Sequence, residues 1–355
     1  MLTLGSLFDG IGVFPLAASH NGITPIWASE IEKAPISITK RHFPDMVHLG
    51  DITKLNGGEI PAVHIITFGS PCQNLSQVGD RSGLAGGKSG LYYQAIRIIK
   101  EMREATDGAF PIITVWENVM GAFSSNDRLD FRAVLQSFTN TEIPMPDSGR
   151  WANAGMVRGR QPDIAWRLFD AQYWGKPRLE QRRRRIFLIS DFGGQRAAKI
   201  LCQPGSMYED TETCRASRMS AAGEDRISAY ETGRQVPVIH PFQNRRMRGN
   251  AKKGNQAGFL GSFGKPTDPF PTLLAGDVTM FSLWNCNDYE NGVIRYLTPL
   301  ESERLMGLPE GWTKYGVDGN RIADGSRYKA LGNAIALPCA EYIIKGIADA
   351  LTGGK

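Results

Sequence analysis

The sequence has few cysteines, no long apolar run and no leader, and each absence narrows what the protein can be. Five cysteines occur in 355 residues, at positions 72, 202, 214, 286 and 339, with no Cys-x-x-Cys pair. This spacing argues against a disulfide framework or a zinc site, and no metal is expected. No uncharged run approaches the roughly 20 residues that span a bilayer, and the N-terminus MLTLGSLFDG lacks the regions of a signal peptide. We therefore expect a cytoplasmic protein without a membrane partner.

Acidic residues are missing from one long segment. None occurs between Thr232 and Thr267, where seven basic residues lie, and the stretch KPRLEQRRRR (176–185) adds six more against one acid. The chain as a whole carries a net charge of +5. Arg and Lys gathered in Gly-, Asn- and Gln-rich sequence are typical of contact with nucleic acid.

Short apolar runs alternate with amphipathic ones over the first half of the chain. Seven runs predict β-strands, at 1–8, 23–29, 46–53, 62–70, 110–119, 164–174 and 184–192. Six stretches predict helices, at 14–22, 32–43, 91–105, 131–138, 298–309 and 333–352. This alternation is typical of an α/β fold with helices on both faces of a mostly parallel sheet.

The alternation stops near Asp191, where Gly, Arg, Asn and Ser become frequent. We predict a catalytic and cofactor-binding domain over residues 1–193, completed by 314–355, and a smaller, loop-rich domain over 194–313. The larger domain is expected to be Rossmann-like, with a mixed, mostly parallel, seven-stranded sheet.

Glycines and acids follow the first three predicted strands. The first strand leads into the turn Asp9-Gly10-Ile11-Gly12, and the second ends at Glu30, twenty residues past Gly10. In Rossmann-type sheets, such a turn lets a ligand approach the backbone, and the following acid binds ribose hydroxyls. The third glycine of the dinucleotide fingerprint is absent, and Asp9 would repel a pyrophosphate. The pattern therefore favours a nucleoside ligand without phosphates, of which S-adenosylmethionine is the commonest, with Asp51 as an acceptor for the adenine amino group.

A thiol and a carboxylate follow the next two strands. The fourth strand runs into Pro71-Cys72, and the fifth runs into Glu117-Asn118. The carboxyl ends of parallel strands meet at one edge of a sheet, so both side chains can face one substrate. Either residue alone is more often structural, but their shared position favours a site.

Nine stretches in order give the chain a specific resemblance. It resembles the DNA (cytosine-5)-methyltransferases along nearly its whole length, through SLFDGIG, ASEIEKAP, GDI, GSPCQNLS, RSGLAGGKSGL, WENV, QRRRRIFLIS, YLTPLESERLMGLP and YKALGNAI. The order of Pro-Cys-Gln, Glu-Asn-Val, Gln-x-Arg-x-Arg and Gly-Asn-Ala makes this resemblance very specific.

The resemblance implies five catalytic residues. The Cys72 thiolate would add to carbon 6 of cytosine, so that carbon 5 becomes nucleophilic. Glu117 would hold ring nitrogen 3, and Arg185 would support the carbonyl oxygen of the base. Arg183 would orient the surrounding groups, and Pro71 would stiffen the turn that aims the thiol.

The resemblance also implies a site for S-adenosylmethionine. Glu30 would bind the ribose, Asp51 the adenine amino group, and Asn333 would lie near the methionine end. The full set of implied cofactor residues is Phe8, Gly10, Gly12, Glu30, Ile31, Asp51, Ile52, Leu91 and Asn333. Within it, Ile31 and Ile52 would sandwich the adenine.

Duplex DNA is the partner that the resemblance implies, with the target cytosine flipped out of the stack. Gln77 or Val78 would fill the vacated space, and Arg245, Arg246 and Arg248 would contact bases and phosphates. A monomer is expected, with a cognate restriction endonuclease as a possible partner in the cell.

The sequence departs from the family pattern in three places. Asp9 stands where the family usually has a small residue, and Val13 where it often has glycine. Extra residues between Pro177 and Gln181 could shift the arginine assignment by a position, and the module between FLIS and YLTP is short, which suggests a short recognition site.

Three other interpretations accompany this prediction. The alternative within the fold is an RNA cytosine-5 methyltransferase. A DNA-binding protein without activity would not require Cys72 and Glu117, and a nicotinamide-dependent dehydrogenase would explain only the first turn.

Overall fold

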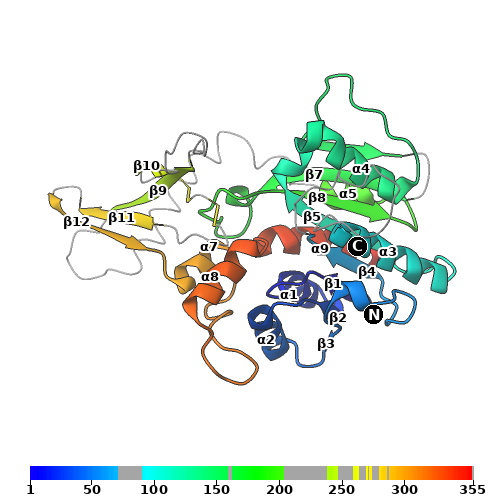
Figure 1. The fold of residues 1–355 in the computed structure, drawn as a ribbon, viewed down its shortest axis with the longest axis horizontal. Helices are drawn as coiled ribbons and strands as arrows, with labels where there is room; N and C mark the ends of the chain where they lie inside the picture. The colour runs from blue at the N-terminus through cyan, green and yellow to red at the C-terminus, as the bar shows by residue number, and fades with distance from the viewer. Residues whose placement is uncertain are drawn as a thin grey trace, which may run out of the picture.

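The computed structural model describes residues 1–70, 90–158, 162–203, 238–246, 259–263, 269–270, 272–273, 280–285 and 288–353. Within this part of the chain, two sheets are present, one of eight strands and one of four. Figure 1 shows the smaller sheet extending to one side of the larger body. None of the helices in the described ranges is long and apolar enough to cross a membrane.

The larger sheet carries its strands in the order β3-β2-β1-β4-β5-β8-β7-β6. β1 to β5 run parallel to one another, whereas β8, β7 and β6 are each antiparallel to the preceding strand in this order. The strands are β1 Thr3–Leu7, β2 Thr24–Ser29, β3 Val47–His48, β4 Ile65–Phe68, β5 Ile113–Val119, β6 Ala154–Val157, β7 Asp163–Asp170 and β8 Arg184–Asp191. Strand order reverses between β1 and β4, which is where sheets of this kind bind ligands.

The mixed, mostly parallel sheet is as predicted, but it has eight strands in place of seven. All seven predicted strands are present, and β6 is the additional one. β6 is four residues long, includes Ala154 and Gly155, and is half exposed at the sheet edge. Such a strand carries too little apolar alternation to be recognised from sequence.

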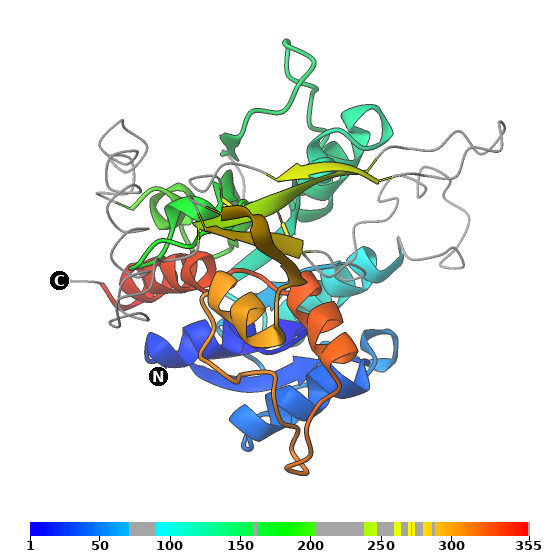
Figure 2. The same ribbon diagram turned by 90° about the vertical axis from the view of Figure 1, so that its left-hand side faces the viewer.

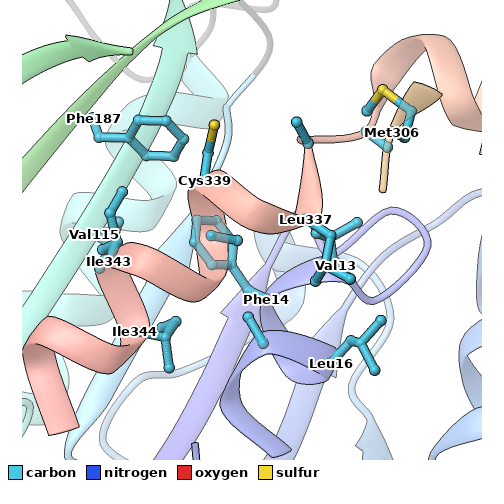
Figure 3. Close-up of a cluster of buried hydrophobic side chains, with 14 of the residues drawn as sticks. Val13, Phe14, Leu16, Val115, Phe187, Met306, Leu337, Cys339, Ile343 and Ile344 are labelled. Atoms are coloured by element: carbon cyan, nitrogen blue, oxygen red, sulfur yellow. The ribbon is translucent and has the colours of Figure 1, made fainter. Parts of the chain in front are cut away.

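Helices cover both faces of the sheet and enclose two clusters of buried side chains. α1, α5 and α9 contribute to one cluster, and α3 and α4 contribute to the other. Figure 3 shows the first cluster, where side chains of α9 lie between α1 and strands β5 and β8. The helices are α1 Val13–His20, α2 Lys33–His42, α3 Gly90–Ala105, α4 Leu129–Thr139, α5 Ala197–Leu201, α7 Pro299–Leu305, α8 Asp324–Asn333 and α9 Leu337–Thr352. Short 3-10 turns occur at η1 Ile52–Lys54, η2 Met120–Phe123, η3 Asn126–Arg128 and η4 Ala171–Tyr173.

The C-terminal helix predicted over 333–352 is present as α9 and begins four residues later, whereas Asn333 is the last residue of α8, a helix that was not predicted. α8 ends at Asn333 and α9 begins at Leu337, so that the residue Asn333 lies at a bend. Pro338 occupies the first turn of α9, where the missing N–H of proline costs no hydrogen bond. The proline therefore starts a new helix, and does not continue the preceding one.

The smaller sheet is antiparallel throughout, in the order β10-β9-β11-β12. Its strands are β9 Val238–Arg246, β10 Phe259–Phe263, β11 Met280–Asn285 and β12 Asp288–Tyr296. Figure 2 looks onto the side of the molecule from which this sheet projects. The domain limits at residues 193 and 313 stay a prediction; the side chains of Leu297, Leu305 and Met306 already pack in the core of the larger body.

Candidate active site

An acid and an arginine meet where β5 pairs with β8. In the antiparallel register, Glu117 lies opposite Phe187, and Val119 lies opposite Arg185. Glu117 and Arg185 are therefore diagonal neighbours on one face of the sheet, within reach of long side chains. The Arg185 Nε donates to Glu117 Oε1 at 2.9 Å, and both side chains are largely buried. This pairing favours Arg185 as the arginine of the site, despite the extra residues before Gln181.

The Glu117 carboxyl sits in a closed environment. Burial raises its pKa above the usual range, although the charges of Arg185 and Arg183 act in the opposite direction. A Cβ at Gly69, just past β4, would lie 3.0 Å from Glu117 Oε2. Gly69 is therefore small because the carboxylate occupies the space beside its Cα. The sequence Gly-Ser-Pro-Cys does not by itself predict that Gly69 makes room for a carboxylate from another strand.

The residues around Glu117 also hold the end of β4. The Asn118 Nδ2 donates to the Ser70 carbonyl at 3.3 Å, and its Oδ1 accepts from the Val119 N–H at 2.8 Å. The Trp116 indole lies 3.4 Å from the Ser70 hydroxyl. Strand β5 thus fixes Ser70, after which the chain continues to the predicted Pro71 and Cys72. These two residues lie outside the described ranges.

Arg183 is buried in a cradle of carbonyl groups. Its Nη1 donates to the Leu273 carbonyl at 3.0 Å, and its Nη2 donates to the Gly332 carbonyl at 2.9 Å and to that of Ala334. Burial lowers its pKa to about 9, so the guanidinium stays charged at neutral pH. Arg183 therefore donates hydrogen bonds to the backbone carbonyls on both sides of Asn333. Asn333 itself is exposed.

The turn after β1 has the backbone that its glycines permit. Phe8, Gly10 and Gly12 have φ angles of 54°, 59° and 76°. The last two angles are readily adopted only by glycine. The Gly10 N–H donates to Glu30 Oε2 at 2.9 Å, and Glu30 Oε1 accepts from the Ile31 N–H at 2.7 Å. The structure thus brings Glu30 and the turn together.

The other predicted cofactor residues differ in exposure. Ile31 is 67% exposed, whereas Ile52 is 3% exposed and packs in the second core cluster, which Phe8 and Leu91 adjoin. The contact of these two isoleucines with adenine stays a prediction. The Asp51 Oδ1 accepts from the Thr53 N–H at 2.9 Å, a bond that lowers the pKa of Asp51 and keeps it ionised.

Asp9 is the unusual member of the turn. Both carboxyl oxygens are buried, and neither makes a hydrogen bond with another described residue. Burial raises its pKa to about 7, and the negative charge of Glu30 adds to this effect, whereas the Ser6 and Thr39 hydroxyls oppose it. The acid expected to repel a pyrophosphate is therefore turned into the protein.

The space beside the turn fits a nucleoside cofactor. A Cβ at Gly10 would meet no atom within 4 Å, so the backbone there is open to a ligand. Glu30 and Asp51 offer carboxylate oxygens for hydroxyl and amino groups, and Asn333 offers an exposed amide. These residue types suit a ribose, an adenine amino group and an amino acid.

The predicted DNA-binding residues lie either on the smaller sheet or outside the described ranges. Gln77, Val78 and Arg248 lie outside the described ranges. Arg245 and Arg246 lie on β9, opposite Leu260 and Phe259 of β10. Their place in a regular antiparallel sheet differs from the loop expected from their Gly- and Asn-rich surroundings.

Known proteins with related sequences include DNA methyltransferases. The family model of C-5 cytosine-specific DNA methylases matches residues 2–349. A DNA N-6-adenine-methyltransferase of Escherichia phage P1 is 26% identical, over 100% of this chain and 62% of the phage protein. The type II methyltransferase M1.ScrFI of Lactococcus lactis subsp. cremoris is 25% identical, over 98% of this chain and 78% of its own length. This chain thus spans less than two thirds of the phage protein.

Two solved structures share the fold. The S. pombe Dnmt2 methyltransferase has a TM-score of 0.56 at 16% identity, with 99% of each chain covered. A prophage-encoded DNA modification methyltransferase of E. coli has a TM-score of 0.55 at 17% identity, covering 99% of this chain and 100% of that one. Together with the family match over nearly the whole length, the fold and the order of motifs lead to one conclusion: this chain belongs to the C-5 cytosine-specific DNA methylases.

Proposed function

We propose that this protein transfers a methyl group from S-adenosylmethionine to carbon 5 of a cytosine flipped out of duplex DNA. The observation that carries the proposal is the buried pair of Glu117 and Arg185, beside the end of β4 that leads to Cys72. A carboxyl and a guanidinium held side by side match the ring nitrogen 3 and the adjacent carbonyl oxygen of cytosine.

The residues divide the reaction between them. The Cys72 thiolate adds to carbon 6, and the electron pair of the ring then makes carbon 5 nucleophilic. Burial raises the pKa of Glu117, so its carboxyl carries a proton in a larger fraction of molecules than an exposed glutamate does and can share that proton with nitrogen 3. Arg185 stabilises the oxygen on which negative charge develops. Once carbon 5 carries the methyl group, its proton leaves to water, the bond between carbon 6 and the Cys72 sulfur breaks, and nitrogen 3 gives back its proton, which restores the aromatic ring.

The methyl donor is proposed for the open space beside Gly10. S-adenosylmethionine supplies an electrophilic methyl group when it is bound. Glu30 would bind the ribose, because its carboxylate accepts from the Gly10 N–H just past the carboxyl end of β2. Asp51, which follows the neighbouring strand β3, would bind the adenine amino group. Asn333, held by Arg183 on its flanking carbonyls, would bind the methionine end.

Two other acceptors are tested by the same experiment. The phage P1 relative is named as a DNA N-6-adenine-methyltransferase. The sequence also leaves cytosine in RNA as an alternative acceptor. Neither interpretation changes the expected donor, but adenine N6 already has a nucleophilic amino group and needs no thiol. The presence of Cys72 and of the Glu117–Arg185 pair therefore favours cytosine.

The experiment is nucleoside analysis after methyl transfer. The protein is incubated with S-adenosylmethionine and either unmethylated duplex DNA or transfer RNA, and the products are digested and weighed by mass spectrometry. We expect 5-methyldeoxycytidine from DNA only, and none with Cys72→Ser. N6-methyldeoxyadenosine as the main product, or 5-methylcytidine from RNA alone, would refute the proposal.

The remaining expectations concern the cell. Type II methyltransferases among the relatives support a restriction endonuclease as a partner of this chain. A cytoplasmic location and a monomeric enzyme fit a protein that meets DNA directly. Arg245, Arg246 and Arg248 are proposed to contact that DNA, with Gln77 or Val78 filling the space that the base leaves.

A further inference from the structure

One buried contact joins the turn after β1 to a distant part of the chain. Trp312 lies between α7 and α8 and is 6% exposed. Its indole Nε1–H donates to the Ile11 carbonyl at 2.8 Å. Ile11 stands between Gly10 and Gly12, the two glycines with left-handed φ angles. The indole therefore holds the middle of the turn beside which the cofactor is proposed to bind.

The turn is also packed against α2. A Cβ at Gly12 would lie 3.1 Å from Thr39 Cγ2 and 3.3 Å from Phe43 Cε2. The Thr39 hydroxyl lies 3.2 Å from the Gly10 carbonyl and 2.9 Å from the Pro35 carbonyl, so its single proton is shared between these two acceptors. α2 thus supports the turn from one side, and the Trp312 hydrogen bond fixes the carbonyl between the glycines.

Trp312 is itself held on two sides. Its ring stacks on His42, with centroids 3.6 Å apart and planes 7° from parallel, and the His42 Nε2 donates to the Trp312 carbonyl at 2.8 Å. The fully buried Glu303 carboxylate accepts from the backbone N–H groups of Gly311 at 2.7 Å and Thr313 at 2.9 Å. The backbone on both sides of Trp312 is therefore fixed, and the indole N–H is held in position to donate to the Ile11 carbonyl.

We propose that Trp312 is a positioning residue for S-adenosylmethionine, acting through the Ile11 carbonyl on the Gly10–Gly12 turn. The inference rests on the proposed function. Two glycines give the turn more conformational freedom than other residues would. If the turn loses its tether, only a fraction of molecules has the binding conformation, and the apparent affinity falls by that fraction.

The test is Trp312→Phe, which keeps an apolar ring over His42 and removes the donor. We expect the dissociation constant for S-adenosylmethionine, measured by calorimetry, to rise about tenfold, in line with the loss of one buried hydrogen bond. The KM for the cofactor should rise similarly, while kcat at saturating cofactor and the KM for DNA stay within about twofold of wild type. Amide hydrogen exchange over residues 10–13 should be faster in the cofactor-free variant.

Trp166→Phe is the matched control. The Trp166 indole is also buried and donates to the Ala152 carbonyl at 3.0 Å, but it belongs to β7, which is four strands away from β1 in the sheet. Its loss should lower the unfolding temperature comparably and leave cofactor affinity unchanged. If Trp312→Phe does not fold, 3-benzothienylalanine at position 312 removes the N–H and keeps the shape of the indole.

Two results separate the inference from the proposed function. Unchanged cofactor affinity and unchanged amide exchange in the position-312 variants, with binding by wild type, would overturn the role of Trp312. Failure of the wild-type protein to bind S-adenosylmethionine would instead overturn the proposed function, and the inference with it.

Discussion

Replacing Asp9 with asparagine should change how the stability of this protein depends on pH. Both oxygens of the Asp9 carboxyl are buried without a hydrogen bond to another described residue. Burial raises the pKa from an ordinary 3.8 to about 7. The folded protein therefore keeps the Asp9 proton through a pH range in which the unfolded chain has lost it.

The sign follows from proton linkage. Below about pH 4 both states hold the proton, and Asp9 costs nothing. Between about pH 4 and pH 7 the unfolded state ionises first, so the folded state loses stability as pH rises, by about 1.4 kcal/mol per unit. Above about pH 7 both states are ionised, and the full cost of about 4 kcal/mol is reached. Asparagine has the shape of the neutral acid and no ionisation to suppress.

Urea unfolding of the cofactor-free protein at pH 5.5 and pH 8 measures the effect. The stability of Asp9→Asn relative to wild type should increase by about 2 kcal/mol between these two pH values. Asp51→Asn is the control, because hydrogen bonds from Thr53 lower the pKa of Asp51, and its contribution is constant over this window. A difference between Asp9→Asn and wild type that is the same at both pH values would refute a neutral, buried Asp9.

Three further changes test the site and the DNA surface. Glu117→Gln should reduce the methylation rate about 10²–10⁴-fold with little change in unfolding temperature; a near-normal rate would reject its role on the base. Gly69→Ala should displace the Glu117 carboxylate and slow methylation by about tenfold to 100-fold, whereas Gly90→Ala, whose new Cβ would meet no atom within 4 Å, should have no effect. Single alanine substitutions of the three arginines at 245, 246 and 248 should have two different effects. At least one variant should show a relaxed sequence preference, and each of the others should reduce the salt slope of DNA binding by about one. Wild-type selectivity and salt slope in all three would place recognition elsewhere.

The elements that position the site were largely predictable from sequence. Apolar runs that end in Glu30, Asp51 or Glu117 predict strands with polar residues near their carboxyl ends. In the structure, Glu30 directly follows β2, Asp51 lies three residues past β3, and Glu117 lies two residues before the end of β5. The glycines of the first turn were predictable for the same local reason: only glycine adopts the left-handed φ angles found at Gly10 and Gly12 without strain.

Contacts between distant segments could not be predicted in this way. The Glu117–Arg185 pair depends on the pairing of β5 with an antiparallel β8 and on their register. Hydrophobic alternation excludes a slip of one residue, but a slip of two residues keeps the alternation and would separate the pair. Trp312 reaches Ile11 across 301 positions of sequence, and nothing near either residue signals the other. The burial of Ile52 likewise depends on the packing of the second core cluster.

The central claim is that Cys72 attacks a cytosine in DNA, and trapping tests it most directly. A duplex in which 5-fluorocytosine replaces cytosine cannot lose the substituent as a proton, so the covalent intermediate accumulates. With S-adenosylmethionine present, we predict a complex of protein and DNA that survives denaturation, with the modified base on the peptide that contains Cys72, and no such complex with Cys72→Ser. Attachment at another residue, or methylated DNA from a Cys72→Ser protein, would contradict the account.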